Sequence, residues 1–295
     1  MSARVDDVKA DAVPATPARP SRLGRFARRN PTIIIGAALL LLVVLAAAIA
    51  PWIAGDPVLL IPSDRLLAPG AKYWLGTDHL GRDIYARTVY GARISLLVGL
   101  CVAGLSVVIG LGIGLAAGYW RRVDKLVMRF MDGLMAIPAI LLAIALVSLN
   151  RASVFIVIVA ITIPEVPRVV RLVRSVVLTV REMPYIEAAV SGGSRGRKIV
   201  LRHILPSTIA PLIVQATYIA ASAILIEAGL SFLGAGVPPE IPTWGNMIAQ
   251  SRLFVARAPW TVFAPGAALA VVVLAVNLVG DGLRDFLDVR LARRM

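Results

Sequence analysis

The residue types that catalyse reactions or bind metals are few in this chain and lie far apart. It has two histidines, His79 and His203, and one cysteine, Cys101. A zinc site needs several His or Cys ligands at short spacing, and neither histidine has such neighbours. Asp78 and Asp83 flank His79 and could in principle hold a metal, but the glycines around them are more typical of a turn. We therefore expect neither a metal site nor a catalytic site.

The lysines exclude nucleotide binding through a P-loop. That loop needs a glycine directly before a lysine, so that backbone N–H groups and the ammonium group hold the phosphates. None of the four lysines follows a glycine: Lys9, Lys72, Lys125 and Lys198. We expect this chain to bind no cofactor. If ATP drives the protein, another polypeptide must hydrolyse it.

Four carboxylates lie within or at the ends of apolar segments: Asp132, Glu165, Glu227 and Asp281. A carboxylate at the bilayer centre costs about 2.5–3.5 kcal/mol on insertion scales, so such groups usually face a cavity or a partner. Asp132 and Asp281 are near segment ends and suit the membrane interface. Glu165 and Glu227 lie deeper. They are candidates for a transport pathway or gate, or for a buried ion pair.

Membrane helices must position these residues. The chain has 295 residues, of which 58% are hydrophobic and 16% are charged, and its mean hydropathy is +0.82. So few charges cannot cover the exterior of a soluble domain. About 20 apolar residues cross ~30 Å of hydrocarbon. The pattern predicts an all-α polytopic membrane protein with six transmembrane helices, the fourth of them weak: 32–52, 95–118, 131–149, 153–170, 209–232 and 260–280.

The basic residues predict the orientation of these helices. Six spans place both termini on one side of the membrane. Assigning that side to the cytoplasm puts 23 of the 31 Lys and Arg residues inside and 8 outside, as the positive-inside rule requires. This distribution accounts for the net charge of +14 without nucleic acid, and it places residues 168–205 in the cytoplasm.

Composition divides the chain into segments. Residues 1–30 are basic and proline-rich, and we expect a disordered cytoplasmic tail beside anionic lipid. Residues 31–53 form the first transmembrane helix. A cleaved signal peptide is the alternative there, but the segment is long and lacks a convincing cleavage site. Residues 54–92 are then extracytoplasmic, 93–282 form the core transmembrane domain, and 283–295 form a cytoplasmic tail.

Three glycines in the second span are spaced four residues apart: Gly110, Gly114 and Gly118. Small residues at this spacing lie on one helix face and let a second helix approach closely. We favour helix packing over a ligand role for them.

The segment 184–206 is the most informative part of the sequence. Pro184 suits a helix start, Gly192 and Gly193 permit a chain reversal, and an apolar pattern resumes at Ile199 and continues to Pro206. These residues predict two short amphipathic helices joined by a glycine turn. The pair either docks against a partner protein or lies on the lipid surface.

This segment resembles the EAA signature of the binding-protein-dependent ABC importer permeases, in their dipeptide, oligopeptide and nickel branch. Glu187, Ala188 and Ala189 are followed at the family's spacing by Gly193 and by the run from His203 to Pro206. Other segments also look like that branch: 75–83 with 91–96, 129–132 with Pro138, 227–234, 242–245 and 280–285. Local departures are Gly192, Pro167 and Val289, where the family usually has a larger apolar residue, Ala and Pro.

The resemblance implies a type I importer with the MetI-like permease fold, located in a bacterial cytoplasmic (inner) membrane. Such a permease pairs with a second, similar permease and two ABC ATPase subunits, and receives a peptide or related small solute from an extracytoplasmic binding protein. It implies that the loop containing Glu187, Ala188, Ala189, Gly193, His203 and Pro206 couples the permease to the ATPase. The external segments would meet the binding protein.

Two other functions remain open at this point. A proton-coupled secondary transporter could use Glu165 and Glu227 as its relay, although six spans without a visible inverted repeat and the EAA-like loop argue against it. A membrane scaffold could use the 184–206 loop to bind a soluble partner without transport. Uptake that depends on a partner ATPase distinguishes all three.

Overall fold

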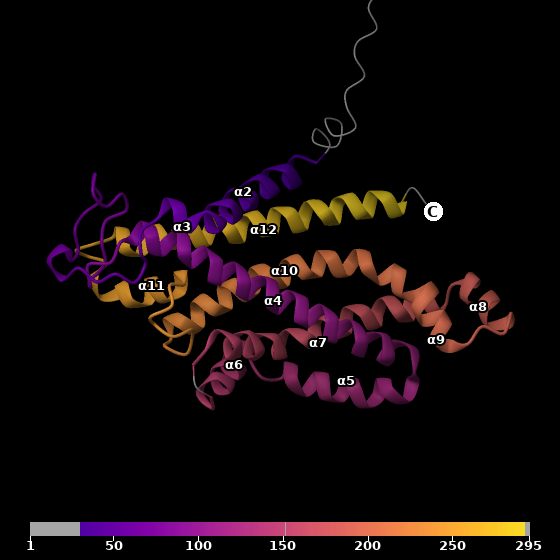
Figure 1. Cartoon of the computed structure of the whole chain (residues 1–295). Coiled ribbons are helices and arrows are strands. Elements are labelled where there is room, and N and C mark those ends of the chain that lie inside the picture. Colours follow the sequence, from indigo (N-terminus) through magenta and orange to yellow (C-terminus); the bar gives the residue numbers. More distant parts are fainter. Residues whose placement is uncertain (1–29, 151, 293–295) are drawn as a thin grey trace, which may run out of the picture.

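The chain forms a bundle of long helices that lie side by side (Figure 1). A computed structural model describes residues 30–150 and 152–292, and these contain no β-strand. The expected tail over residues 1–29 lies outside the described residues. The long helices are α2 (Pro31–Ala48), α4 (Ile84–Tyr119), α5 (Arg121–Met135), α6 (Ala139–Ser148), α7 (Val154–Arg181), α10 (Leu205–Phe232) and α12 (Trp260–Ala292). The short α-helices are α3 (Ala50–Ile53), α8 (Pro184–Ser191), α9 (Gly196–Ile199) and α11 (Trp244–Ser251).

Within the described residues, four helices are long and apolar enough to cross a membrane: α2, α4, α12 and the continuous helix Gly196–Phe232 that contains α10. Counting the bent pair α5–α6 as one span gives five. α7 has 28 residues, but its first part already contains Glu165, Arg168 and Arg171, which make it too polar for the same test. The expected all-α polytopic membrane fold is confirmed, and the sixth span stays a prediction.

The third expected span, 131–149, is not one straight helix. α5 ends at Met135, α6 begins at Ala139, and the two axes differ by 85°. Pro138 lies in the break, and its ring disfavours helical backbone at the preceding residue. The hydropathy of the segment is continuous across this point, so hydropathy alone does not reveal the bend.

α4 and α7 pack closely through the three spaced glycines. A Cβ atom placed on Gly110, Gly114 or Gly118 would lie 2.5–2.7 Å from the Cβ atoms of Val169, Val173 and Val177, respectively. Side chains larger than hydrogen would therefore force the helices apart. The packing role expected for these glycines is confirmed, and α4 and α7 form one tightly fitted pair.

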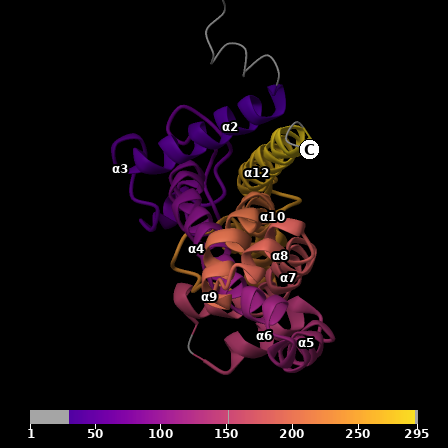
Figure 2. The same cartoon turned by 90° about the vertical axis from the view of Figure 1, so that its right-hand side faces the viewer.

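The short helices gather at the two ends of the bundle. α8 and α9 lie at one end, together with the carboxyl-terminal end of α12, while α3 and α11 lie at the other (Figures 1 and 2). We call α8, the glycine turn and α9 the hairpin (184–199), and residues 54–83 with 233–259 the cap. α12 continues to Ala292, so the expected carboxyl-terminal tail is helical up to that residue.

Candidate functional site

The hairpin has the helix, glycine turn and helix expected from the sequence. α8 begins at Pro184 and ends at Ser191. Its end is closed by two backbone hydrogen bonds, from Gly193 N to Val190 O at 2.9 Å and from Ser194 N to Ala189 O at 3.0 Å. This pair of bonds is the Schellman arrangement, which needs a left-handed residue after the helix. Gly193 supplies it, with φ of +78°.

The second limb of the hairpin runs into α10 without a break. The backbone N–H of Leu205 bonds to Val200 O, five residues back, and residues 200–204 form one π-helical turn. The sequence suggested that the helical pattern stops at Pro206, but this proline lies in the first turn of α10. A proline lacks the N–H that a regular α-helix would use, and the wider π turn just before it accommodates this change.

One face of the hairpin is buried and the other is open. Ile186, Ile199, Val200 and Ile204 are buried in the same apolar cluster as Val177 and Val180 of α7. Glu187 and Ala188 are exposed, Ala189 is half-buried and Pro206 is exposed. Large apolar side chains are also exposed around them: Met183, Tyr185, Val190 and Leu201. This face combines apolar area with the Glu187 carboxylate and with three exposed cations of the second limb, Arg195, Arg197 and Lys198, a composition that suits contact with a protein partner.

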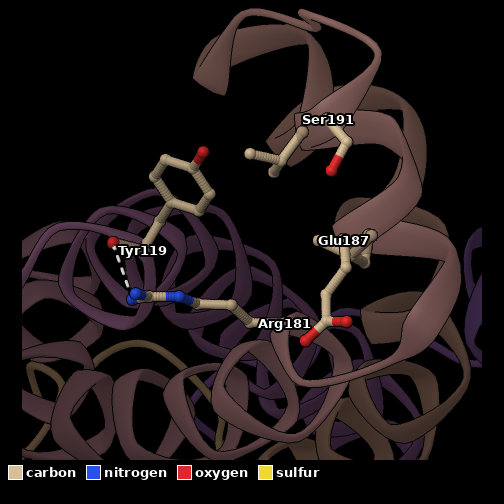
Figure 3. Close-up of a pocket in the computed structure, with 6 residues that line it drawn as sticks. Tyr119, Arg181, Glu187 and Ser191 are labelled. Atoms are coloured by element: carbon tan, nitrogen blue, oxygen red, sulfur yellow. Dashed lines mark hydrogen bonds between the residues drawn. The ribbon is translucent and has the colours of Figure 1, made fainter.

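A pocket of about 590 Å³ separates α8 from the ends of α4 and α7. It is lined by Tyr119, Arg181, Ile186, Glu187, Val190 and Ser191. Figure 3 shows Glu187 and Ser191 on the α8 side and Tyr119 and Arg181 opposite them. Arg181 Nη1 donates a hydrogen bond to the carbonyl oxygen of Tyr119 at 3.3 Å, which joins the last residue of α7 to the last residue of α4.

Tyr119 and Arg181 were not among the residues singled out from the sequence. Their role follows from the fold, because 61 intervening residues separate two helix ends that meet only after α4 and α7 have packed. The sequence signals only that Tyr119 follows the long apolar stretch 95–118 and that Arg181 precedes the segment 184–206.

Glu165 is a paired carboxylate. It lies in α7 between Pro164 and Pro167, with its side chain fully buried, and Arg168 Nη1 lies 3.2 Å from both carboxylate oxygens. α7 remains helical across both prolines. Further along α7, Arg171 pairs with Asp132 at 2.6 Å and Arg174 with Asp124 at 2.5 Å, both of α5. A row of arginines on α7 thus neutralises carboxylates on α5 and on α7 itself.

Glu227 lies in α10 where that helix meets α11. It is fully buried, and Ser231 Oγ donates a hydrogen bond to Oε1 at 2.8 Å. Thr243 lies close to the carboxylate, but Oε2 has no hydrogen-bond partner. α11 approaches closely here, since a Cβ on Gly245 would lie 2.5 Å from Ala228 Cα. Glu227 therefore lies at the junction between α10 and α11, and among the described residues no hydrogen bond joins it to Glu165.

The cap holds the Asp78 turn that the sequence suggested. Asp78 Oδ1 accepts hydrogen bonds from the backbone N–H groups of Leu80 and Arg82, and Gly81 has φ of +79°. Asp78 Oδ2 lies 2.6 Å from Arg82 Nε, and both side chains are buried. His79 stacks on Phe254, with ring centroids 5.2 Å apart. No group of three His, Cys, Asp or Glu side chains within the described ranges is placed to hold a metal ion.

Comparison with known proteins gives consistent results. Residues 107–293 match the family model described as "Binding-protein-dependent transport system inner membrane component". A protein of Sinorhizobium fredii named a probable peptide ABC transporter permease, y4tQ, is 60% identical over 270 residues, which cover 92% of this chain and 93% of that protein. The di/tripeptide transport system permease protein DppC of Pseudomonas aeruginosa is 42% identical and is matched over 87% of both chains.

A solved structure shares the fold. A chain of the MetNI methionine ABC transporter, in inward-facing conformations, superposes with a TM-score of 0.55 at 21% sequence identity. The match covers 66% of this chain and 93% of that chain. At this identity the match concerns the fold alone, and it agrees with the MetI-like fold implied by the sequence.

Proposed function

This chain belongs to the family of binding-protein-dependent transport system inner membrane components, and we propose that it carries dipeptides or short oligopeptides into the cell as one permease of an ATP-driven importer. The peptide class follows from the names of relatives at 42–60% identity over most of both chains. A secondary transporter and a passive scaffold find no support among these relatives. The chain contributes the membrane path and not the hydrolysis of ATP.

The observation that carries the mechanism is the open face of the hairpin. A permease without a P-loop must receive work from its ATPase through a rigid contact. The hairpin supplies one, because its buried face is fixed in the bundle and its other face exposes Glu187 beside apolar side chains. Glu187 lies in the first turn of α8, where a negative charge suits the helix dipole and can pair with basic groups of an ATPase.

The proposal includes an orientation and a set of partners. The hairpin faces the cytoplasm and two ABC ATPase subunits, and the cap faces the other side and the binding protein. A second, homologous permease completes the path, and anionic lipid surrounds the basic cytoplasmic segments. The excess of Lys and Arg on the hairpin side supports this orientation.

Labelling of single cysteines in whole cells tests the orientation. In a Cys101→Ser background, a membrane-impermeant thiol reagent should label a cysteine at Asp64 and not one at Ser194. The reverse pattern would invert the topology and remove the hairpin from any cytoplasmic ATPase.

Charge reversal at Glu187 tests the coupling. Glu187→Lys should reduce copurification of the ATPase subunits with the permease and reduce uptake of a labelled dipeptide. Glu240→Lys is the matched control, because Glu240 is an exposed carboxylate of the cap, at the opposite end of the bundle. It should leave ATPase copurification unchanged. Wild-type association and uptake in Glu187→Lys would show that this loop is not the coupling element.

A further inference from the structure

Tyr119 at the end of α4 lies directly against the second limb of the hairpin. A Cβ placed on Gly196 would lie 2.9 Å from Tyr119 Oη and 3.0 Å from its ring atom Cε1. The phenol ring thus occupies the space beside the Gly196 backbone that a side chain would need. Tyr119 also packs against the apolar cluster that contains Ile186 and Ile199, one buried residue from each limb of the hairpin.

This contact gives the hairpin a third attachment to the bundle. α8 is joined to α7 through Glu182 and Met183, and α9 continues through the π turn into α10. Neither connection reaches α4 directly. Tyr119 does, and its backbone carbonyl is also held by Arg181 at the end of α7. Figure 3 shows this arrangement, with the Tyr119 ring extending from the helix end toward the hairpin.

The α4–α7 pair can pass on a displacement received at this point. Gly114 and Gly118 fit against Val173 and Val177 within the last turns of α4, so the two helices cannot slide past each other without a clash. Close-packed interiors transmit strain because they compress little. A tyrosine ring is also a stiff connector, since its side chain has only two rotatable torsions.

We propose that Tyr119 is a positioning residue that transmits movement of the hairpin to the α4–α7 pair. This inference rests on the proposed coupling function of the hairpin and adds a route for it. When an ATPase displaces the hairpin, the Gly196 backbone presses on the ring, and α4 and α7 move together with it. Without the ring, the hairpin remains linked to α7 and α10, but α4 no longer follows it directly.

The test uses the full transporter in proteoliposomes, with its ATPase subunits and substrate-loaded binding protein. Three quantities are measured for each variant: ATPase copurification, ATP hydrolysis, and dipeptide taken up per ATP hydrolysed. Tyr119→Ala enlarges the pocket that Glu187 also lines, but it should retain ATPase association, since every exposed side chain of α8 stays in place. Its uptake per ATP should fall about tenfold. Tyr119→Phe keeps the ring and should behave like the wild type.

A second variant perturbs the same contact from the hairpin side. Gly196→Ala adds a methyl group where only 2.9 Å is available, so it should also lower uptake per ATP. Gly192→Ala is the matched control, because Gly192 has φ of −74° and its added Cβ would meet nothing closer than 3.3 Å. Combining Gly196→Ala with Tyr119→Phe should restore part of the loss, since the tightest clash is with Tyr119 Oη.

The outcomes separate this inference from the function on which it rests. Wild-type uptake per ATP in both Tyr119→Ala and Gly196→Ala would overturn the role of Tyr119 and leave the coupling hairpin intact. Loss of ATPase association in Tyr119→Ala would also overturn it, because the ring would then shape the docking surface. Whether the hairpin couples the permease to the ATPase at all is decided separately, by ATPase copurification and uptake in Glu187→Lys.

Discussion

The cap and the hairpin lie at opposite ends of one bundle and are held in different ways. Polar contacts between distant segments join the cap. Arg82 Nη2 donates to Gln250 Oε1 at 2.6 Å, and Trp260 Nε1 donates to Thr77 O at 3.3 Å. Among the described residues, no side-chain hydrogen bond or ion pair joins the hairpin to the rest of the chain. Buried aliphatic side chains and the Tyr119 contact hold it.

The difference shows at which end of the bundle the charged side chains find their partners in this chain. In the cap, the buried charges find partners in the same chain, so its shape is defined before any other protein binds. In the hairpin, the Glu187 carboxylate has no hydrogen-bond or ion-pair partner among residues 30–150 and 152–292, and the apolar side chains around it are exposed. Substitutions in the cap should therefore lower the stability of the fold. Substitutions on the open face of the hairpin should instead weaken association with the ATPase subunits.

The largest expected effect comes from breaking the buried charge cluster of the cap. Asp78→Ala removes the partner of Arg82 and also leaves Arg87, which is 1% exposed and lies 3.9 Å from the same carboxylate, without a counter-charge. Removing one member of a buried ion pair costs about 3–5 kcal/mol. We expect a corresponding drop in the free energy of unfolding, measured by thermal unfolding of the purified protein in detergent.

Two variants sharpen this result. Lys72→Ala breaks the pair with Asp64, but Lys72 is 71% exposed and solvent screens the pair, so stability should fall far less than in Asp78→Ala. Glu187→Ala on the hairpin should also change stability by no more than about 0.5 kcal/mol, while it weakens ATPase association. If Glu187→Ala destabilises the fold as much as Asp78→Ala, the contrast between the two ends is wrong.

The next effect concerns Glu227, at the junction of the bundle and the cap. Ser231→Ala removes the hydroxyl that donates to Oε1 of this buried carboxylate, which should cost about 1–3 kcal/mol of stability. Glu227→Gln keeps the size of the side chain and can still accept that bond. It should preserve assembly while lowering uptake, if the charge serves transport. Unchanged uptake in Glu227→Ala would show that the residue is only tolerated there.

The sequence predicted this architecture to different depths in different places. Local signals were sufficient for the hairpin, because Pro184 and Gly193 each determine the backbone of their own turn. They were also sufficient for Gly110, Gly114 and Gly118, whose spacing defines a helix face. Local signals did not reveal contacts between segments distant in sequence. The contact of Tyr119 with Gly196 and that of Arg82 with Gln250 form only when the helices pack together.

A smaller effect is expected at the turn of the hairpin. Gly193 has φ of +78°, and nothing lies within 4 Å of an added Cβ, so a side chain there is strained by backbone conformation and not by crowding. Left-handed backbone costs an L-residue roughly 1–2 kcal/mol. Gly193→Val should therefore tilt the hairpin and reduce uptake more than membrane insertion. Gly193→Asn, which tolerates this conformation, is the control, and equal uptake by both variants would contradict the strain argument.

The smallest effect is a pH dependence confined to the cap. Burial lowers the pKa of His79 below its ordinary value of 6.5, and the neighbouring Arg82, Arg65 and Arg87 act in the same direction against the opposing charge of Asp78. The unfolded chain then binds a proton more readily than the folded one, so stability falls as the pH drops below about 6.5. The melting temperature should decrease slightly between about pH 7.5 and 5.5.

His79→Phe keeps a ring to stack on Phe254 but cannot titrate, so its melting temperature should decrease less over the same interval. An identical slope in this variant would assign the pH dependence to other groups and leave His79 as a packing residue only.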